Sequence, residues 1–400
     1  MNLVNGTLKK KLLQFKHMIA IAKPYLTNEE AQAAYDTILT GWITQGPKVE
    51  EFEKKFAAYT GAKYAIAVSN CTTALHLAMI IAGINAGDEV LCPSLSYIAT
   101  ANAIKYVGAK PIFVEVQPDT YNMDPVDAEK KITSKTKAIL VVHQIGMPAD
   151  IDAFQDLCIK YNIKLIEDAA CAAGSSYKGK RIGSHSSLAC FSFHPRKVIT
   201  TGEGGMITTD RDDYYERFKL LRQHGMSIND RVRHEAKKIV FEDHVEVGYN
   251  YRMTDIQAAV GIKQLEKLDW IVGERRKIAA AYHEAFKDLP FIQLPLEKEG
   301  YLSNYQSYSI YLKNGCPIDR NTLMQELLNC GISSRRGIMT SHRETAYKNE
   351  STDLTLPVSE DLQDNSIILP LYIPMKENEI RFIIDTFSAL VKNKLQDVLI

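Results

Sequence analysis

Between about residues 60 and 210, short apolar runs alternate with longer segments in which apolar residues recur at helical spacing. The runs that predict strands are residues 64–68, 89–92, 111–116, 138–142 and 164–167. Helical spacing occurs in residues 72–84, 96–107, 126–132 and 150–161. Continuous apolar strands separated by helices are typical of a parallel sheet that helices cover on both faces. The pattern therefore predicts a three-layer αβα domain of the α/β class with a mostly parallel sheet.

Two further strands are predicted at residues 188–193 and 205–209, with a glycine-rich loop between them. A long amphipathic helix then follows, broken or bent at Gly273. Beyond Pro290 we expect a smaller α+β domain, with strands at 306–312 and 331–335 and helices at 319–329 and 377–394. The predicted organisation is an N-terminal extension (1–17), a large domain (18–253), a connecting helix (254–289) and a small C-terminal domain (290–400).

Composition narrows the class of protein. Lys and Arg together number 48, as do Asp and Glu, so the formal net charge is zero. This balance argues against a protein whose main role is to bind nucleic acid or an anionic membrane. A net charge of zero also permits self-association. The seven cysteines form no CxxC pair and no metal-ligand pattern, and several lie in apolar runs, which is typical of reduced core thiols in a cytoplasmic protein. No apolar run approaches the roughly 18 residues of a membrane span.

Ligands of an open parallel sheet bind at the carboxyl ends of its strands. After the first strand, Cys71 and Thr72 open a helix whose free N–H groups could bind a phosphate, although small polar residues also cap ordinary helices. After the next strand comes Tyr97, which could stack on a flat ring or lie in the core.

A carboxylate follows the strand at 164–167. Asp168 ends an apolar segment, where a charged group needs a partner. A pyridinium nitrogen would suit, and the pair would keep the ring an electron sink. A helix cap or a metal ligand is the alternative for this aspartate.

The loop after residues 188–193 has a serine and a lysine five positions apart. Ser192 and Lys197 precede the glycine cluster Gly202 to Gly205, which lets backbone approach a ligand. A lysine amine can form an imine with an aldehyde cofactor when its site is partly desolvated. Farther along, Asn250 and Arg252 offer an amide and a guanidinium to a phosphate or carboxylate, and Thr254 or Asp255 is positioned to cap the next helix.

In this order, the motifs resemble those of the DegT/DnrJ/EryC1/StrS sugar aminotransferases, enzymes of pyridoxal-phosphate (PLP) fold type I. The resemblance runs from about Ile19 to the C-terminus. It rests on Gly41-Trp-Ile-Thr-Gln-Gly-Pro47, Glu167-Asp-Ala-Ala, Ser192-Phe-His-Pro-x-Lys197, Thr201-Gly-Glu-Gly-Gly205, His224-Gly225 and Gly248-Tyr-Asn-Tyr-Arg-Met253.

The resemblance implies roles for the site residues. Lys197 would carry PLP as a Schiff base, and Asp168 would pair with the ring nitrogen. Tyr97 would lie on the ring face. Cys71, Thr72 and Ser192 would surround the phosphate, and Asn250 would reach it from the partner subunit of a homodimer. Many members have glycine where Cys71 stands, and many have glutamine where Cys171 stands, touching the ring hydroxyl.

The resemblance also implies the reaction. Glutamate would be the amino donor and a nucleotide-linked keto-sugar the acceptor. The product would serve the synthesis of a surface polysaccharide such as lipopolysaccharide, or of a specialised sugar. Some relatives are sugar dehydratases with histidine at the lysine position, so Lys197 favours transamination. Arg252, Arg335, Arg336 and His342 are candidates for binding the substrate. The sequence does not identify the nucleotide (GDP, UDP or dTDP) or the carbon that is aminated. A sugar acid without a nucleotide is a further alternative for the acceptor.

Overall fold

The computed structural model describes residues 18–228, 238–239 and 241–398. The predicted extension at residues 1–17 lies outside the described residues.

The seven predicted strands of the large domain all form and join one sheet. They are β1 (Tyr64–Val68), β2 (Glu89–Pro93), β3 (Lys110–Val114), β4 (Thr136–Val142), β5 (Lys164–Asp168), β8 (Ala189–Ser192) and β9 (Gly205–Thr209). Their order is β1-β9-β8-β5-β4-β2-β3. Strand β9 runs antiparallel to both of its neighbours, and the pairs from β8 to β3 are parallel. The mostly parallel sheet is confirmed.

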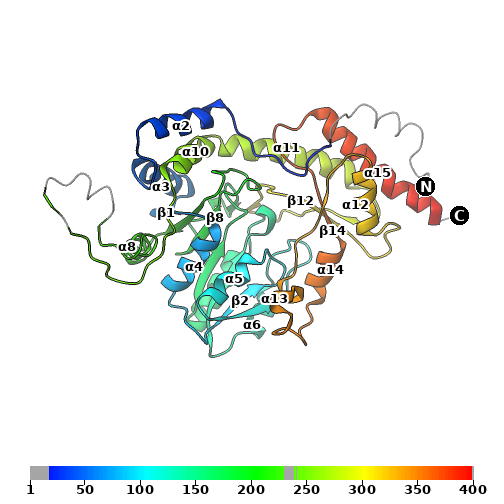
Figure 1. Cartoon of the computed structure of the whole chain (residues 1–400). Coiled ribbons are helices and arrows are strands. Elements are labelled where there is room, and N and C mark those ends of the chain that lie inside the picture. The colour runs from blue at the N-terminus through cyan, green and yellow to red at the C-terminus, as the bar shows by residue number, and fades with distance from the viewer. Residues whose placement is uncertain (1–17, 229–237, 240, 399–400) are drawn as a thin grey trace.

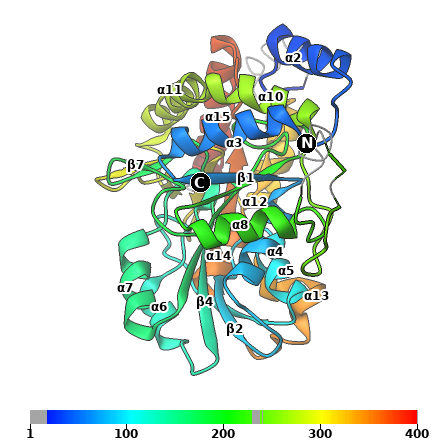
Figure 2. The same cartoon turned by 90° about the vertical axis from the view of Figure 1, so that its left-hand side faces the viewer.

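Alternate residues of the strands face different helices. Ala138 and Leu140 of β4 pack in one cluster with residues of α4 (Cys71–Ile81) and α5 (Ala99–Tyr106). Ile139 and Val141 pack in another with residues of α6 (Pro125–Lys130) and α7 (Ile151–Tyr161). Figure 2 shows α6 and α7 on one side of the strands and α4 and α5 on the other. This period of two produces the three layers.

Four more helices and a small sheet complete this part of the molecule. They are α2 (Asn28–Leu39), α3 (Pro47–Thr60), α8 (Asp212–Leu221) and α10 (Asp255–Glu266), with β6 (Ser176–Tyr177), β7 (Lys180–Arg181) and β11 (Tyr301–Leu302). Thr254 is the N-cap of α10, with a capping box to Gln257. The Asp255 carboxylate instead accepts from backbone N–H groups at the start of α3, including those of Gly46 and Val49.

The predicted connecting helix is two helices, α10 and α11 (Leu268–Phe286), which meet at Lys267. The expected break at Gly273 was wrong, because Gly273 lies inside α11. The Lys267 ammonium reaches back to α2, where it lies 2.7 Å from Glu30 and 2.9 Å from Glu29. These contacts hold the junction of the two helices against the N-terminal helix.

The C-terminal part has a four-stranded antiparallel sheet in the order β10-β12-β14-β13. Its strands are β10 (Ile292–Gln293), β12 (Tyr308–Leu312), β13 (Arg335–Arg336) and β14 (Ser366–Leu369). Its helices are α12 (Arg320–Asn329), α13 (Thr345–Lys348), α14 (Pro357–Asn365) and α15 (Glu377–Val398). Figure 1 shows α11 and α15 at the top of the view, with the large sheet below.

Residues of α13 and α14 pack back on the large domain. Tyr347 and Leu356 join the cluster of α4 and α5, and Leu362 packs with Leu95. Residues 345–365 thus bring C-terminal chain to the carboxyl ends of β2 and β3. Within the part of the chain that the structure describes, every helix falls short of the length and apolarity needed to cross a bilayer.

Candidate active site

The glycine cluster brings β9 against the first turn of α4. A Cβ atom on Gly205 would lie 2.5 Å from the carbonyl carbon of Asn70 and 2.8 Å from the backbone nitrogen of Cys71. Only glycine allows this approach. Because β9 pairs with β8, the same contact places Ser192 at the end of β8 near the start of α4.

The start of α4 has the groups needed to bind a phosphate. Its N-cap is Asn70, whose side chain accepts from the N–H of Thr73. In the described part of the chain, the Thr72 hydroxyl has no hydrogen-bond partner, while Ser192 accepts one weak bond, 3.4 Å from the N–H of His194. The Cys71 thiol points inward and contacts the carbonyl oxygen of Cys190 at 3.5 Å. Cys71 can therefore offer a ligand its backbone N–H, as glycine would.

Asp168 ends β5 as a buried carboxylate, 5% exposed. Its Oδ1 accepts from the N–H of Ala170 at 3.1 Å, and its Oδ2 accepts from the Thr100 hydroxyl at 2.8 Å. Burial raises the pKa of Asp168, and these two hydrogen bonds and the positive charge of Lys197 oppose that rise. A cationic ring nitrogen would complete the compensation of this charge.

The neighbouring carboxylate, Glu167, has a different partner, which no sequence motif marks. Its Oε2 lies 2.8 Å from His143 Nε2, and both side chains are fully buried. His143 Nδ1 accepts from the N–H of Ala149 at 3.0 Å, which leaves the proton on Nε2, directed at Glu167. Burial alone would raise the pKa of Glu167, but the hydrogen bond and charge of His143, with smaller contributions from Ser186 and His185, together lower it.

Lys197 lies in the loop after β8, in a turn closed by its own N–H to the carbonyl of His194. Its side chain is half-buried, and Nζ donates to Cys171 Sγ at 3.1 Å. Burial pushes the pKa of Lys197 down, but Cys171, Asp168 and Cys71 together raise it above its usual value. These neighbours favour the protonated amine, which must lose its proton to act as a nucleophile.

A loop of the C-terminal part braces the segments that carry Cys171 and Lys197. The Asn304 amide donates to the carbonyls of Cys171 and Ala173, at 2.7 and 2.9 Å. The Gln306 amide donates to the carbonyl of Arg196 at 2.8 Å.

Behind this loop, Arg275 donates to the carbonyls of Tyr305 and Gln306, at 2.9 and 2.6 Å. The sequence does not reveal this brace, because its asparagine, glutamine and arginine belong to no recognisable motif.

The remaining predicted residues lie more openly. Tyr97 follows β2 and is 71% exposed. Asn250 is exposed, and within the described residues its side chain makes no hydrogen bond, while Arg252 is half-buried.

Arg335 and Arg336 are exposed on β13. Burial of part of its side chain lowers the pKa of Arg335, and the positive charges of Arg196 and Arg336 lower it further.

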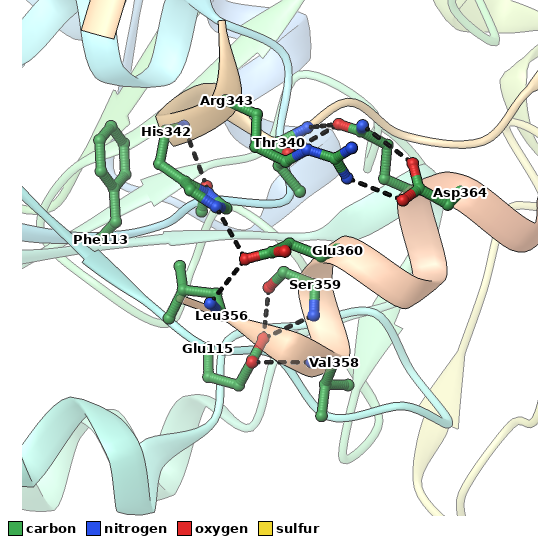
Figure 3. Close-up of polar contacts among 12 residues, drawn as sticks. Phe113, Glu115, Thr340, His342, Arg343, Leu356, Val358, Ser359, Glu360 and Asp364 are labelled. Carbon is green, nitrogen blue, oxygen red and sulfur yellow. Dashed lines mark hydrogen bonds and ion pairs between the residues drawn. The ribbon is translucent and has the colours of Figure 1, made fainter. Parts of the chain in front are cut away.

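His342 is the exception among the predicted substrate residues. It is 3% exposed, with Nδ1 2.6 Å from the Ser94 hydroxyl and Nε2 3.2 Å from Glu360 Oε1. Figure 3 shows the ring between Phe113 and Glu360. Both nitrogens are occupied within the fold, so the structure gives no support to contact between this ring and the substrate. His342 comes two residues after Thr340, whose backbone pairs with Leu95 and so joins the chain after β13 to the large domain.

The residues fit PLP. A helix N-terminus with an unpartnered hydroxyl suits a phosphate, a buried carboxylate suits a pyridinium nitrogen, and Lys197 is electrostatically coupled to that carboxylate. Cys171 contacts Lys197 directly and can offer a thiol where a cofactor hydroxyl would need a partner.

Comparisons with known proteins agree with this site. A model of the DegT/DnrJ/EryC1/StrS aminotransferase family matches residues 24–388. The PLP form of Spr1654 from Streptococcus pneumoniae, a candidate sugar aminotransferase, is 31% identical, with a TM-score of 0.87 over 94% of this chain and 100% of that chain.

Two further solved structures extend the comparison. DesV from S. venezuelae, solved with a ketimine intermediate, is 31% identical, with a TM-score of 0.87 over 94% of this chain and 99% of that chain. PseC from Helicobacter pylori, an aminotransferase involved in the biosynthesis of pseudoaminic acid, is 27% identical, with a TM-score of 0.86 over 95% of this chain and 100% of that chain. The chain therefore belongs to the DegT/DnrJ/EryC1/StrS aminotransferase family and is a PLP-dependent sugar aminotransferase.

Proposed function

We propose that the enzyme transfers the amino group of glutamate to a nucleotide-linked keto-sugar. The observation that carries this proposal is a Lys197 whose positive charge acts on the buried Asp168, together with three exposed arginines, Arg196, Arg335 and Arg336, which we assign to the rim of the site. The first two residues suit amino-group chemistry on PLP. The three arginines suit an acceptor or donor that carries negative charge.

When bound, PLP supplies an electron-withdrawing ring that stabilises negative charge on the carbon next to the amino nitrogen. Asp168 holds a proton at the ring nitrogen, because an ionised carboxylate in a buried site favours the charged form of its partner. Thr72 and Ser192 would hold the phosphate through their hydroxyls, together with the N–H groups that open α4. Tyr97 would lie on the ring face.

Lys197 has two tasks in this proposal. Its amine would hold PLP covalently, through the cofactor aldehyde. When not bonded to the cofactor, the amine would serve as a general base and acid, moving a proton between the α-carbon of glutamate and the cofactor. The Gln306 bond to the carbonyl of Arg196 restricts the backbone next to Lys197 during both tasks.

The arginines of the rim are placed to bind anionic groups. Arg335 has no carboxylate partner in the described part of the chain, and Arg336 has one, Glu344, at 3.8 Å. The positive charges of Arg196 and Arg336 act against that of Arg335, and a phosphate or carboxylate of the substrate would relieve that repulsion. Arg252 is a further candidate for this binding. A sugar acid without a nucleotide would satisfy the same groups.

We further propose a homodimer with shared active sites, in which Asn250 reaches the phosphate in the partner subunit. Asn250 is exposed, and apolar side chains close to it in sequence are exposed too, among them Phe241, Val245 and Val247. Apolar groups at a surface are covered when a second copy packs there. All seven cysteines are free thiols, which suits a reducing compartment such as the cytoplasm.

A screen of keto-sugars with glutamate, read by the release of 2-oxoglutarate, tests the proposal. We expect release with at least one nucleotide-linked keto-sugar. Release with sugar acids alone would move the acceptor to that class. Release with no keto-sugar, from protein that retains PLP, would contradict glutamate as the donor, and other amino acids would then be compared.

A further inference from the structure

The Asp168 carboxylate is linked to two buried hydroxyl groups. Its Oδ2 accepts from Thr100, a 1% exposed residue of the first turns of α5. The Thr100 oxygen lies 2.8 Å from the hydroxyl oxygen of Ser96, which is also buried. Three oxygen atoms thus form a continuous chain from the loop after β2 to the end of β5.

The direction of the hydrogen bonds in this chain follows from the charge on Asp168. An ionised carboxylate can only accept, so the one hydrogen of the Thr100 hydroxyl is directed at Oδ2. The contact between the two hydroxyls then requires Ser96 to donate to Thr100. Each donor strengthens the next bond, because a hydroxyl that accepts a hydrogen bond donates more strongly.

The C-terminal part of the chain fixes this loop in place. Leu95 and Thr340 form an antiparallel bridge, with the N–H of Ser96 3.0 Å from the carbonyl of Met339. On the other side of the bridge, the N–H of Ser341 lies 2.8 Å from the carbonyl of Ser94. The backbone of Ser96 is therefore fixed where its hydroxyl can reach Thr100.

His342 closes the same contact. The Ser94 hydroxyl oxygen accepts from the backbone N–H of His342 at 3.2 Å, so its own hydrogen is free for the ring Nδ1 at 2.6 Å. The ring proton then lies on Nε2, directed at Glu360 (Figure 3). Burial lowers the pKa of His342, in agreement with a neutral ring. Through its contacts with Ser94, this buried histidine holds residues 339–342 against the loop that precedes Tyr97.

We infer that Thr100, supported by Ser96, is a positioning residue that holds the Asp168 carboxylate ionised and oriented for the cofactor ring nitrogen. The inference rests on the proposed role of Asp168. The charged and titratable groups that face Asp168 are Lys197, His143, Cys71 and Cys190. Thr100 supplies the only side-chain hydrogen bond to Asp168 within the described part of the chain.

The test uses two variants that differ in one hydroxyl. Thr100→Val keeps the shape of the side chain and removes the donor, while Thr100→Ser keeps the donor. The measurement is the affinity of the cofactor-free protein for PLP as a function of pH, read from the visible absorbance of the bound cofactor. The Thr100 bond lowers the pKa of Asp168, so its loss lets the carboxyl take up a proton at higher pH.

As the pH is lowered, the PLP affinity of Thr100→Val should therefore begin to decrease at a pH about one unit higher than in the wild type. Thr100→Ser should restore the wild-type profile. Thr208→Val is the matched control, because the buried Thr208 hydroxyl donates at 2.8 Å to the carbonyl of Gly183 and does not touch Asp168. It should leave the profile unchanged.

Three outcomes would overturn the inference. They are a Thr100→Val profile equal to that of the wild type, a Thr100→Ser profile equal to that of Thr100→Val, and an equal shift in Thr208→Val. If Thr100→Val does not fold, Ser96→Ala should shift the profile in the same direction by less, and no shift would be decisive against it. An Asp168→Asn protein with unchanged PLP affinity and activity would instead refute the proposed role of Asp168 itself.

Discussion

The floor and the rim of the active site are built differently. The floor, defined here as Thr100, Asp168, Cys171 and Lys197, consists of groups that hydrogen-bond to neighbours in the same chain. The rim, defined as Tyr97, Arg196, Asn250, Arg335 and Arg336, is exposed and makes few such bonds. A chemical step needs preorganised groups, while a rim with unmet charges and open surface suits substrate and a second subunit. Variants of the two regions should therefore fail in different ways.

The largest loss is expected for Lys197→Ala. We expect it to lose the visible absorbance of the lysine-bound cofactor and all measurable transamination, because no other described lysine side chain contacts Cys171 or is coupled to Asp168. Absorbance spectra and 2-oxoglutarate release measure both. A variant that keeps its spectrum and its activity would show that another lysine carries the cofactor.

Asp168→Asn should keep weak PLP binding and lose activity by about 10²- to 10⁴-fold, the equivalent of roughly 3–5 kcal/mol for a broken buried ion pair. An amide does not stabilise a protonated ring nitrogen as a carboxylate does. Single-turnover rates with glutamate measure the loss. Near-normal rates would mean that another group faces the ring nitrogen.

The floor was more predictable from the sequence than its supports. Asp168 and Lys197 follow apolar strands, and the alternation of apolar and polar segments was enough to find those strands and the parallel sheet. The supports come from distant chain, since Asn304 lies 133 residues from Cys171 and His342 lies 248 from Ser94. No local pattern could reveal that His342 is buried, and its chemistry alone suggested a ligand for substrate.

The same limit explains the errors in the secondary structure. A long amphipathic helix is expected to break at a glycine. This one breaks at Lys267, where contacts with Glu29 and Glu30 stabilise the junction of the two helices. The inward direction of the Cys71 thiol is also a tertiary effect, because its contact is the carbonyl oxygen of Cys190 on β8. Strand position is a local property, whereas the orientation of a polar side chain depends on its partner.

Subunit mixing tests the role of Asn250 in the rim. Asn250→Asp should nearly abolish activity by placing a carboxylate against the cofactor phosphate. Mixed with Lys197→Ala under conditions of subunit exchange, it should recover about a quarter of wild-type activity if each site takes Asn250 from the partner. Half of the dimers are then mixed, and one of the two sites in each is intact, as expected for random pairing of closed symmetric dimers.

A mixture of two floor variants is the matched control. Lys197→Ala and Asp168→Asn alter the same chain's floor, so no mixed dimer has an intact site and no activity should be recovered beyond that of Asp168→Asn. Confirmed exchange without recovery in the Asn250 mixture would contradict the shared site. Recovery in the control mixture would show that the floor is itself divided between subunits.

The smallest effect is expected for Tyr97→Ala. Stacking contributes about 0.5–1.5 kcal/mol beyond burial, so PLP affinity should fall about 2- to 12-fold, with little change in the relative rates for different sugars. Tyr97→Phe keeps the ring and should retain the affinity. Tyr106 is a matched control, since it is also exposed, lies at the end of α5 and packs edge-on against His76. Equal PLP affinity in Tyr97→Ala and Tyr106→Ala would show that Tyr97 does not stack on the cofactor. A loss as large as that of Asp168→Asn would show instead that Tyr97 belongs with the floor, because an exposed ring that only stacks cannot account for it.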